Sequence, residues 1–276
     1  MTISRAQLAK ELEPGLNALF GLEYDRYENE AAEIFESEGS DRAFEEEVML
    51  SGFGTAPVKS EGSAINFDNA QETYTARYTM ETIALAFSIT EEAVEDNLYD
   101  RLAARYTRAL ARSMAQTKQI KGATVLNNAF LTTSPIGDGA ALCSAAHPSL
   151  SGNQTNLLAT PADLNETSLE EILIQIAGFT DERGLKIAVR GTKLMIPKEL
   201  QFIAERIINS NLRPGSADND INAMKSMGML PEGAAVNHFF TDADAYFVKT
   251  DCPNGFKLFN RTPLKTAMEG DFDTGN

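Results

Sequence analysis

The chain has 276 residues, 43% of them hydrophobic, which is enough to bury one large core or two ordinary ones. Its formal net charge of −16 argues against a general nucleic-acid-binding surface, because such a surface needs basic patches. The two cysteines, Cys143 and Cys252, imply no disulfide framework and favour a reducing compartment. The first residues lack the apolar core of a signal peptide, and no run of about 18 apolar residues predicts a membrane span.

The first 50 residues carry much of the acid, with 13 Asp and Glu against 4 Lys and Arg. Residues 4–20 have the spacing of a helix with Ser4 as a candidate N-cap, although Pro14 is expected to divide it into two short pieces. Residues 29–50 are glutamate-rich and weakly apolar, which predicts an extended arm. This acidic arm is either solvated or placed against a basic surface, and the Glu45–Glu47 run on its own is typical of a solvated face.

Residues 46–90 are predicted to form a long hairpin. The outgoing arm is EEVMLSGFGTAP, and the return arm, ETYTARYTMETIALAFSI, predicts a strand of about 15 residues, twice the usual length or more. Gly, Ser, Pro and Asn between the two arms are typical of a loop. Because an isolated two-stranded ribbon is marginal in water, this hairpin needs burial from outside itself.

Residues 90–130 are predicted to form one helix of around 40 residues, far above the usual ~11–12, with Thr90 as its cap and Gly122 as a point where it ends or bends. Its expected apolar face includes Leu102, Tyr106, Leu110 and Met114. A second stripe, at spacings of four, three and four, consists of Arg101, Arg105, Arg108 and Arg112. Three interpretations of this stripe stay open: ion pairs with local acids, pairing with the acidic arm of another subunit, or contact with packaged nucleic acid.

The rest of the chain reads as discontinuous helices and strands, so the predicted class is α+β. Residues 132–167 are loop-rich, residues 168–179 predict a helix, and LKIAVRGTKLMIP after Gly184 predicts two short strands. Pro197 opens a further helix, short strands are expected near 235–239 and 245–249, and the tail is partly extended.

The sequence offers little catalytic chemistry. Cys143, Cys252, His147 and His238 are too few and too scattered for a zinc site, and Cys143 with His147 is a weak nucleophile pair. No phosphate-binding loop and no dinucleotide glycine fingerprint is present. We therefore predict no enzymatic activity and no cofactor or metal.

The order of acidic arm, long hairpin, very long helix and mixed domain resembles the major capsid protein of tailed bacteriophages, and more closely the Mu-like major head subunit family. The resemblance spans most of residues 50–260, and its segments include RYTMETIALAFSITEEAVEDNLY, RLAARYTRALARSMAQTKQI, AAHPSLSGNQTN and LMIPKELQFIAERIINSNLRPGSADNDIN. It implies an N-terminal arm (1–45), an E-loop hairpin (46–90), a peripheral domain with a spine helix (91–134), an axial domain (135–255) and a return to the peripheral domain (256–276). Relatives continue past the EGDFDTGN region, so we expect the chain to be truncated there.

The resemblance implies a structural role rather than turnover. Copies would self-assemble into hexamers and pentamers of an icosahedral shell that encloses double-stranded DNA without reading its sequence. Portal and scaffolding proteins, and possibly a decoration protein, are the implied partners; no membrane is involved, and assembly is expected in the host bacterial cytoplasm before the protein resides in the virion. The intersubunit residues expected are Tyr78, Ile83, Leu85, Arg101, Arg105, Arg108 and Arg112. The alternatives are an encapsulin-like nanocompartment shell with the same fold and a soluble enzyme or small-molecule binder.

Overall fold

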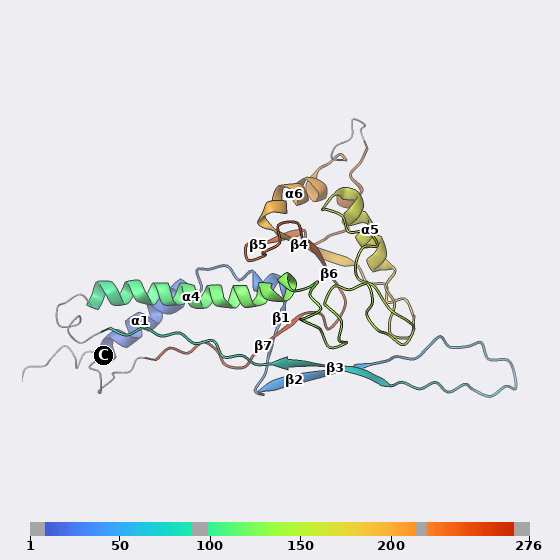
Figure 1. Ribbon diagram of the computed structural model, residues 1–276, viewed down its shortest axis with the longest axis horizontal. Helices are drawn as coiled ribbons and strands as arrows, with labels where there is room; N and C mark the ends of the chain where they lie inside the picture. Colours follow the sequence, from blue (N-terminus) through green and yellow to red (C-terminus); the bar gives the residue numbers. More distant parts are fainter. Residues whose placement is uncertain (1–8, 90–98, 214–219, 268–276) are drawn as a thin grey trace, which may run out of the picture.

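The computed structural model describes residues 9–89, 99–213 and 220–267, and shows an elongated molecule with a helical pair at one end, a hairpin that projects from the other, and a body above them (Figure 1). The helices are α1 (Ala9–Tyr24), α2 (Ala31–Ile34), α4 (Tyr99–Asn127), α5 (Glu166–Ala177), the 3-10 helix η2 (Lys198–Leu200), α6 (Gln201–Asn209) and α7 (Ala223–Met227). The strands are β1 (Glu36–Gly39), β2 (Phe44–Leu50), β3 (Glu72–Thr79), β4 (Gly191–Pro197), β5 (Ala234–Asn237), β6 (Phe247–Thr250) and β7 (Lys257–Asn260). The predicted mixed α and β class is confirmed.

The body is built on the three-stranded sheet β5-β4-β6, in which β4 is parallel to β5 and antiparallel to β6. Side chains alternate across a strand, so β4 presents Leu194 and Ile196 to one layer and Met195 to the other. The first layer is the main core, closed by α5 and α6 (Figure 1). The second is a smaller core in which Met195 meets Ile34 of α2 and Leu126 of α4. The body is thereby joined to both the arm and the long helix.

Helix α5 overlaps the predicted helix of residues 168–179 but begins and ends two residues earlier, at Glu166 and Ala177. Asn165 accepts a hydrogen bond from the Ser168 amide at 2.9 Å, while the Ser168 hydroxyl accepts one from the Asn165 amide at 3.0 Å. This reciprocal cap satisfies two amides that the first turn leaves without helical partners. Leu169, Leu173 and Ile176 follow at helical spacing and are buried in the main core.

The long helix differs from its prediction in which face is buried. The buried residues of α4 are Ala103, Thr107, Ala111, Ala115, Gln119, Ala123 and Leu126, and the first four lie one position after Leu102, Tyr106, Leu110 and Met114 of the expected apolar face. Tyr106, expected inside, is 49% exposed. Helix α1 packs against α4. Small side chains let two helix backbones approach closely, so we attribute the choice of buried face to the close approach of the two helices rather than to the size of the buried side chains.

Two predictions about helix breaks are wrong. Helix α1 runs unbroken over Pro14, because its packing against α4 outweighs the hydrogen bond that a proline cannot donate. Gly122 lies inside α4, which continues to Asn127, and a Cβ there would stand 2.9 Å from the Ala31 Cβ. Gly122 is therefore a point of close contact with α2 rather than a helix end. The expected caps Ser4 and Thr90 lie outside the described residues.

Three further predictions need correction. The acidic segment 29–50 is not simply an extended arm, because it contains α2 and β1, and Ile34 is 1% exposed. The expected strand of about 15 residues is β3, which has 8 residues, and residues 80–89 run on without regular structure. The two strands expected in residues 185–197 are the single strand β4. Each of these strands pairs with another segment of the chain, and the residues of the strand alone do not indicate where that pairing begins or ends.

Within the described residues, no helix is both long enough and apolar enough to cross a membrane.

Candidate functional site

The hairpin formed by β2 and β3 is largely exposed, and its two faces differ. The ladder is antiparallel, with Phe44 opposite Thr79 and Leu50 opposite Glu72. On one face Phe44, Val48 and Leu50 are exposed. The other face lies against the body, since Tyr78 packs on Phe259 of β7 and a Cβ at Gly137 would stand 2.9 Å from the Ala76 Cβ. The chain thus covers one face of the ribbon and leaves the other uncovered.

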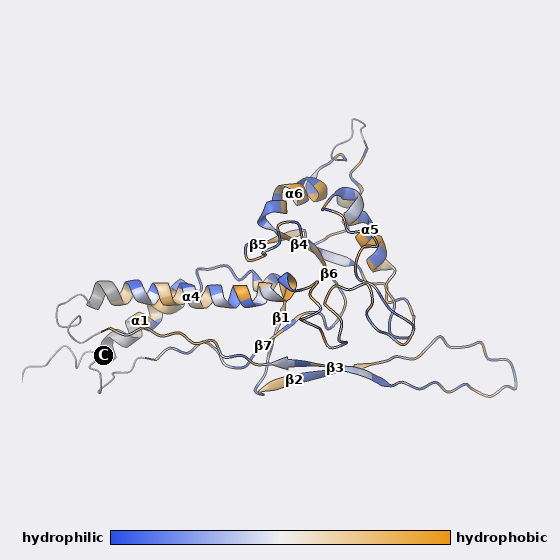
Figure 2. Cartoon of the chain, in the orientation of Figure 1, coloured by the Kyte–Doolittle hydropathy of each residue, from blue (hydrophilic) through white to orange (hydrophobic). Residues whose placement is uncertain are grey.

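Apolar residues occur along the hairpin as well as in the helices (Figure 2), and many of those in and around the hairpin are exposed. The exposed large apolar residues between positions 44 and 87 are Phe44, Val48, Met49, Leu50, Phe53, Val58, Ile65, Phe67, Ile83, Leu85 and Phe87. Val58 is 98% exposed and Phe67 is 96% exposed. A single exposed apolar residue needs no explanation, but a run of them along one projecting segment indicates an interaction surface.

The expected interface residues Ile83 and Leu85 lie in the extended segment that follows β3. They are 39% and 55% exposed. The segment approaches α4 at two points: the rings of Phe87 and Tyr106 lie 5.9 Å apart, and Lys121 bonds Glu81 at 2.7 Å. The segment is therefore held against α4 at Glu81 and at Phe87, while the side chains of Ile83 and Leu85 between these points stay exposed.

Tyr78, the third apolar interface candidate, is largely engaged within its own chain. Its ring meets Phe259 edge-on at 5.1 Å, and its hydroxyl donates to Glu47 at 3.1 Å. Burial, followed by the Glu47 carboxylate, raises the pKa of Tyr78 above its usual range. The structure places Tyr78 where the hairpin meets the body, while Ile83 and Leu85 stay accessible.

Three of the four arginines of the stripe lie on the exposed side of α4. Arg105, Arg108 and Arg112 are exposed and form no ion pair with any of the described acids, and Arg101 belongs to the same helix. Several arm acids instead bind cations of their own chain. Lys193 binds Glu33 at 2.5 Å, and the His238 ring and amide both contact the Glu30 carboxylate. These carboxylates are therefore occupied rather than free for the stripe.

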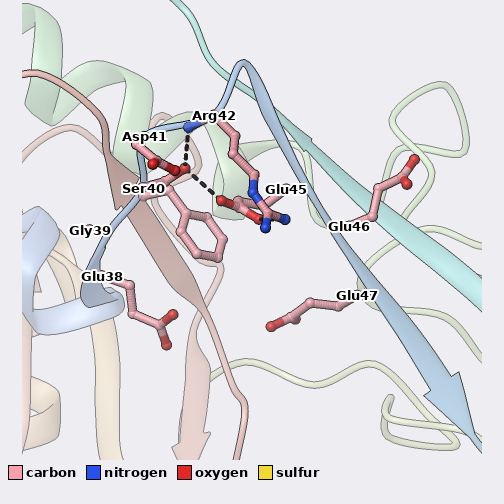
Figure 3. Close-up of a pocket in the computed structure, with 9 residues that line it drawn as sticks. Glu38, Gly39, Ser40, Asp41, Arg42, Glu45, Glu46 and Glu47 are labelled. Carbon is pink, nitrogen blue, oxygen red and sulfur yellow. Dashed lines mark hydrogen bonds and ion pairs between the residues drawn. The ribbon is translucent and has the colours of Figure 1, made fainter.

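The turn between β1 and β2 forms an open acidic groove with a volume of about 530 Å³ (Figure 3). Its lining residues are Glu38, Gly39, Ser40, Asp41, Arg42, Glu45, Glu46, Glu47 and Phe259. Most of the acids are already bonded: Lys257 binds Glu38 and Glu47, Arg77 binds Glu46 at 2.7 Å, and Ser40 donates to Glu45 at 2.6 Å. The Glu45–Glu47 run is consequently a set of structural ion pairs rather than only a solvated face. No cluster of potential ligands that could hold a metal ion occurs in the part of the chain described.

The loop after α4 holds the one buried histidine–carboxylate pair among the described residues. His147 Nδ1 lies 2.6 Å from Asp138 Oδ2. Burial raises the pKa of the Cys143 thiol to about 11, the opposite of what a nucleophile needs. Asp138 also accepts from the Ala140 amide at 2.9 Å, as a turn-forming aspartate does. This geometry organises a loop and offers no activated nucleophile.

A family model described as phage capsid protein matches residues 73–276 of the chain. No curated protein matches the sequence. Among solved structures, the bacteriophage JBD30 capsid is similar with a TM-score of 0.58 and 11% identity, covering 76% of this chain and 90% of that one. The JBD30 procapsid, computed in I4 symmetry, gives a TM-score of 0.53 and 13% identity over 88% of this chain and 100% of that one. At 11% and 13% identity, the similarity to these two structures shows a shared fold and no more.

Proposed function

The chain belongs to the phage capsid protein family, and from this premise we propose that it is the major head subunit, which assembles into hexamers and pentamers of an icosahedral shell around double-stranded DNA. Family membership and the similarity in fold to capsid and procapsid subunits favour this function over an encapsulin-like compartment. The proposed role is structural, with no reaction catalysed.

The observation that carries the proposal is the uncovered apolar surface of the hairpin. Burial of apolar surface contributes about 25 cal/mol per Å², so side chains such as Val58 and Phe67 gain most when a second molecule covers them. In a shell of identical subunits, each hairpin can be covered by a neighbour, and the repeated contact closes into rings. Large obligate interfaces of this kind bury about 2,000–5,000 Å².

We assign the finer parts of the fold by the same proposal. Residues 46–90 act as the E-loop, α4 as the spine helix of a peripheral domain, and residues 135–255 as the axial domain that meets its copies at the ring centres. The chain is placed in the Mu-like subfamily on the sequence segments quoted above. These assignments are consistent with a projecting hairpin, a long helix and a separate body (Figure 1).

The proposed interface combines apolar and basic residues. Ile83 and Leu85, with a smaller share from Tyr78, are covered by a neighbouring subunit. The stripe of Arg101, Arg105, Arg108 and Arg112 faces either an acidic surface of another subunit or the packaged DNA. Portal and scaffolding proteins act during assembly in the host cytoplasm, and the finished protein resides in the virion. A decoration protein is a possible further partner, given the minor capsid protein trimers on the JBD30 capsid.

Electron microscopy of the expressed full chain tests this function, alone and with its candidate scaffolding protein. We expect hollow shells from the natural sequence and few or none from Leu85→Asp. Ile174→Asp is the comparison variant, because Ile174 is 73% exposed on α5, outside residues 46–90; an equal loss of shells from both variants would show that the effect is not specific to the hairpin region. A compact monomer under every condition would contradict the proposed function. Normal shells from Leu85→Asp would show that the extended segment after β3 is not part of the interface between subunits.

A further inference from the structure

The hairpin continues well past its last ladder pair, and one carboxylate ties its two arms together there. Beyond Leu50 and Glu72, the Ser51 amide donates to the Gln71 carbonyl at 2.8 Å, and the Gln71 amide to the Ser51 hydroxyl at 2.9 Å. Farther out, the Gly54 amide donates to Asp68 Oδ2 at 2.7 Å. Among the described residues, no hydrogen bond joins the arms beyond Asp68, so residues 55–67 project from this point.

The same carboxylate joins the hairpin to the body. Arg183 Nη2 donates to both oxygens of Asp68, at 2.8 and 3.0 Å, across 115 positions of sequence. A Cβ at Gly54 would lie 3.5 Å from Arg183 Nη2 and 3.4 Å from Asp68 Oδ2, which is ordinary van der Waals contact, so Gly54 lies directly beside this ion pair. Asp68 therefore binds the outgoing arm, the return arm and the body at one place.

Arg183 stands on a rigid support. Asp181 Oδ1 accepts from the Arg183 amide at 2.9 Å and from the Leu185 amide at 2.8 Å, which closes a tight turn. Gly184 has a φ of +82° in this turn, a conformation that favours glycine. The turn is fixed to the neighbouring loop because Glu182, 8% exposed, accepts from the Leu150 amide and its carbonyl accepts from the Ser151 amide at 3.1 Å.

We propose that Arg183 is a positioning residue: by gripping Asp68 it sets the direction in which residues 55–67 project before a second copy of the chain covers them. The expected effect on assembly rests on the proposed function, but the grip, meaning the ion pair between Arg183 and Asp68, is a property of the single subunit. A preset direction lowers the conformational entropy lost when the neighbour binds, which is the usual benefit of preorganisation. The amides of Gly54 and Asn69, followed by Arg183, hold the pKa of Asp68 below its usual range, so the grip persists at neutral pH.

Hydrogen exchange of the unassembled full chain tests the grip. In Arg183→Ala we expect the hydrogen-bonded amides of Gly54, Asn69 and Gln71 to exchange about three- to tenfold faster, while those of β4 are unchanged. Arg183→Lys retains one charged contact and is expected to fall between the two. Arg206→Ala is the matched control, because Arg206 is exposed on α6 and forms no ion pair with described residues.

Shell formation by the same variants tests the consequence. We expect Arg183→Ala to give slower assembly by light scattering and fewer regular shells by microscopy, with Arg183→Lys intermediate. Unchanged exchange in Arg183→Ala would overturn the grip, whatever the shells do. Faster exchange with normal assembly would overturn the positioning role and leave the proposed function intact. A failure of the natural chain to assemble at all would count against the proposed function, while the exchange result still decides the grip.

Discussion

The body around β4 buries its apolar side chains, whereas the hairpin of β2 and β3 leaves many of its apolar side chains exposed. In the body, Leu194 and Ile196 are completely buried between the sheet and its helices. In the hairpin, Leu50 is 63% exposed and Phe67 is 96% exposed. Both regions are sheets with apolar residues, so composition does not separate them. The difference is that the body has a second layer of its own, whereas the described residues leave one face of the hairpin uncovered.

This contrast predicts that substitutions in the body act on folding and those in the hairpin act on assembly. The unassembled subunit and the assembled shell are therefore the two states to compare for every variant.

The largest expected effect on folding is that of Leu194→Ala. Leu194 is 0% exposed in the main core, and removing a buried leucine side chain usually lowers the free energy of unfolding by about 2–5 kcal/mol. Leu85→Ala is the counterpart in the hairpin region and should change it by less than about 0.5 kcal/mol. Urea unfolding of the unassembled subunit measures both. Equal losses of unfolding free energy in the two variants would contradict the proposed difference between the body and the hairpin.

Gly191→Ala should have the next largest effect. A Cβ at this position in β4 would lie 2.6 Å from Leu173 Cδ2 and 2.9 Å from Val248 Cγ1, so the main core must shift to accept it. We expect a loss of about 1–3 kcal/mol in the same unfolding assay, as is typical of overpacking. Gly39→Ala in β1 is the control, because nothing lies within 4 Å of its added Cβ. A neutral Gly191→Ala would show that this part of the core is loosely packed.

Glu232→Gln is expected to have a small, pH-dependent effect. A hydrogen bond from Lys193 holds the pKa of Glu232 below its usual range, so the ion pair contributes stability above the ordinary carboxylate pKa and loses it as the pH falls through the folded pKa. Because Glu232 is half exposed, the contribution at pH 7 is below about 1 kcal/mol. Unfolding curves of both proteins should differ at pH 7 and converge as the pH falls through the folded pKa of Glu232. Glu61→Gln, in the hairpin loop, should show no such convergence, and a difference that grows toward acid would contradict the assigned sign.

The smallest expected effect on folding comes from Val58→Ser combined with Phe67→Ser. Both side chains are almost fully exposed, so the free energy of unfolding of the subunit should change by less than about 0.5 kcal/mol. The yield of shells should nevertheless fall strongly, because the apolar area available to a neighbour is lost. Sedimentation of assembled material gives the yield. Full yield with unchanged folding would mean that the hairpin tip stays uncovered in the shell.

Local sequence was enough to find most of the elements. The turn at Gly184 and the helix after Pro197 depend on a few neighbouring positions, and each lies where the pattern indicates. The hairpin was also foreseeable, since two strand-like arms flank a loop of turn-forming residues. The predicted interface residues Ile83 and Leu85 were found from the same pattern, and their role stays a prediction.

What local sequence missed depends on groups far apart along the chain. The face of α4 that is buried was one position away from the largest side chains, because α1 needs small residues for close approach. The glutamates of the arm looked solvated, yet Glu33 and Glu47 bind Lys193 and Lys257 at separations of 160 and 210 residues. No periodicity signals such pairs, because charges are abundant and their partners are chosen by the fold.

The sequence by itself therefore determined that this chain contains a projecting ribbon too poor in internal burial to stand alone and a long basic helix beside it. Only the tertiary structure decided which surfaces stay uncovered, and that a single arginine on a rigid turn holds the ribbon by Asp68. The physical reason is that hydrogen-bonding preference and side-chain alternation act between near neighbours, whereas burial and ion pairing depend on which distant segments the folded chain brings together.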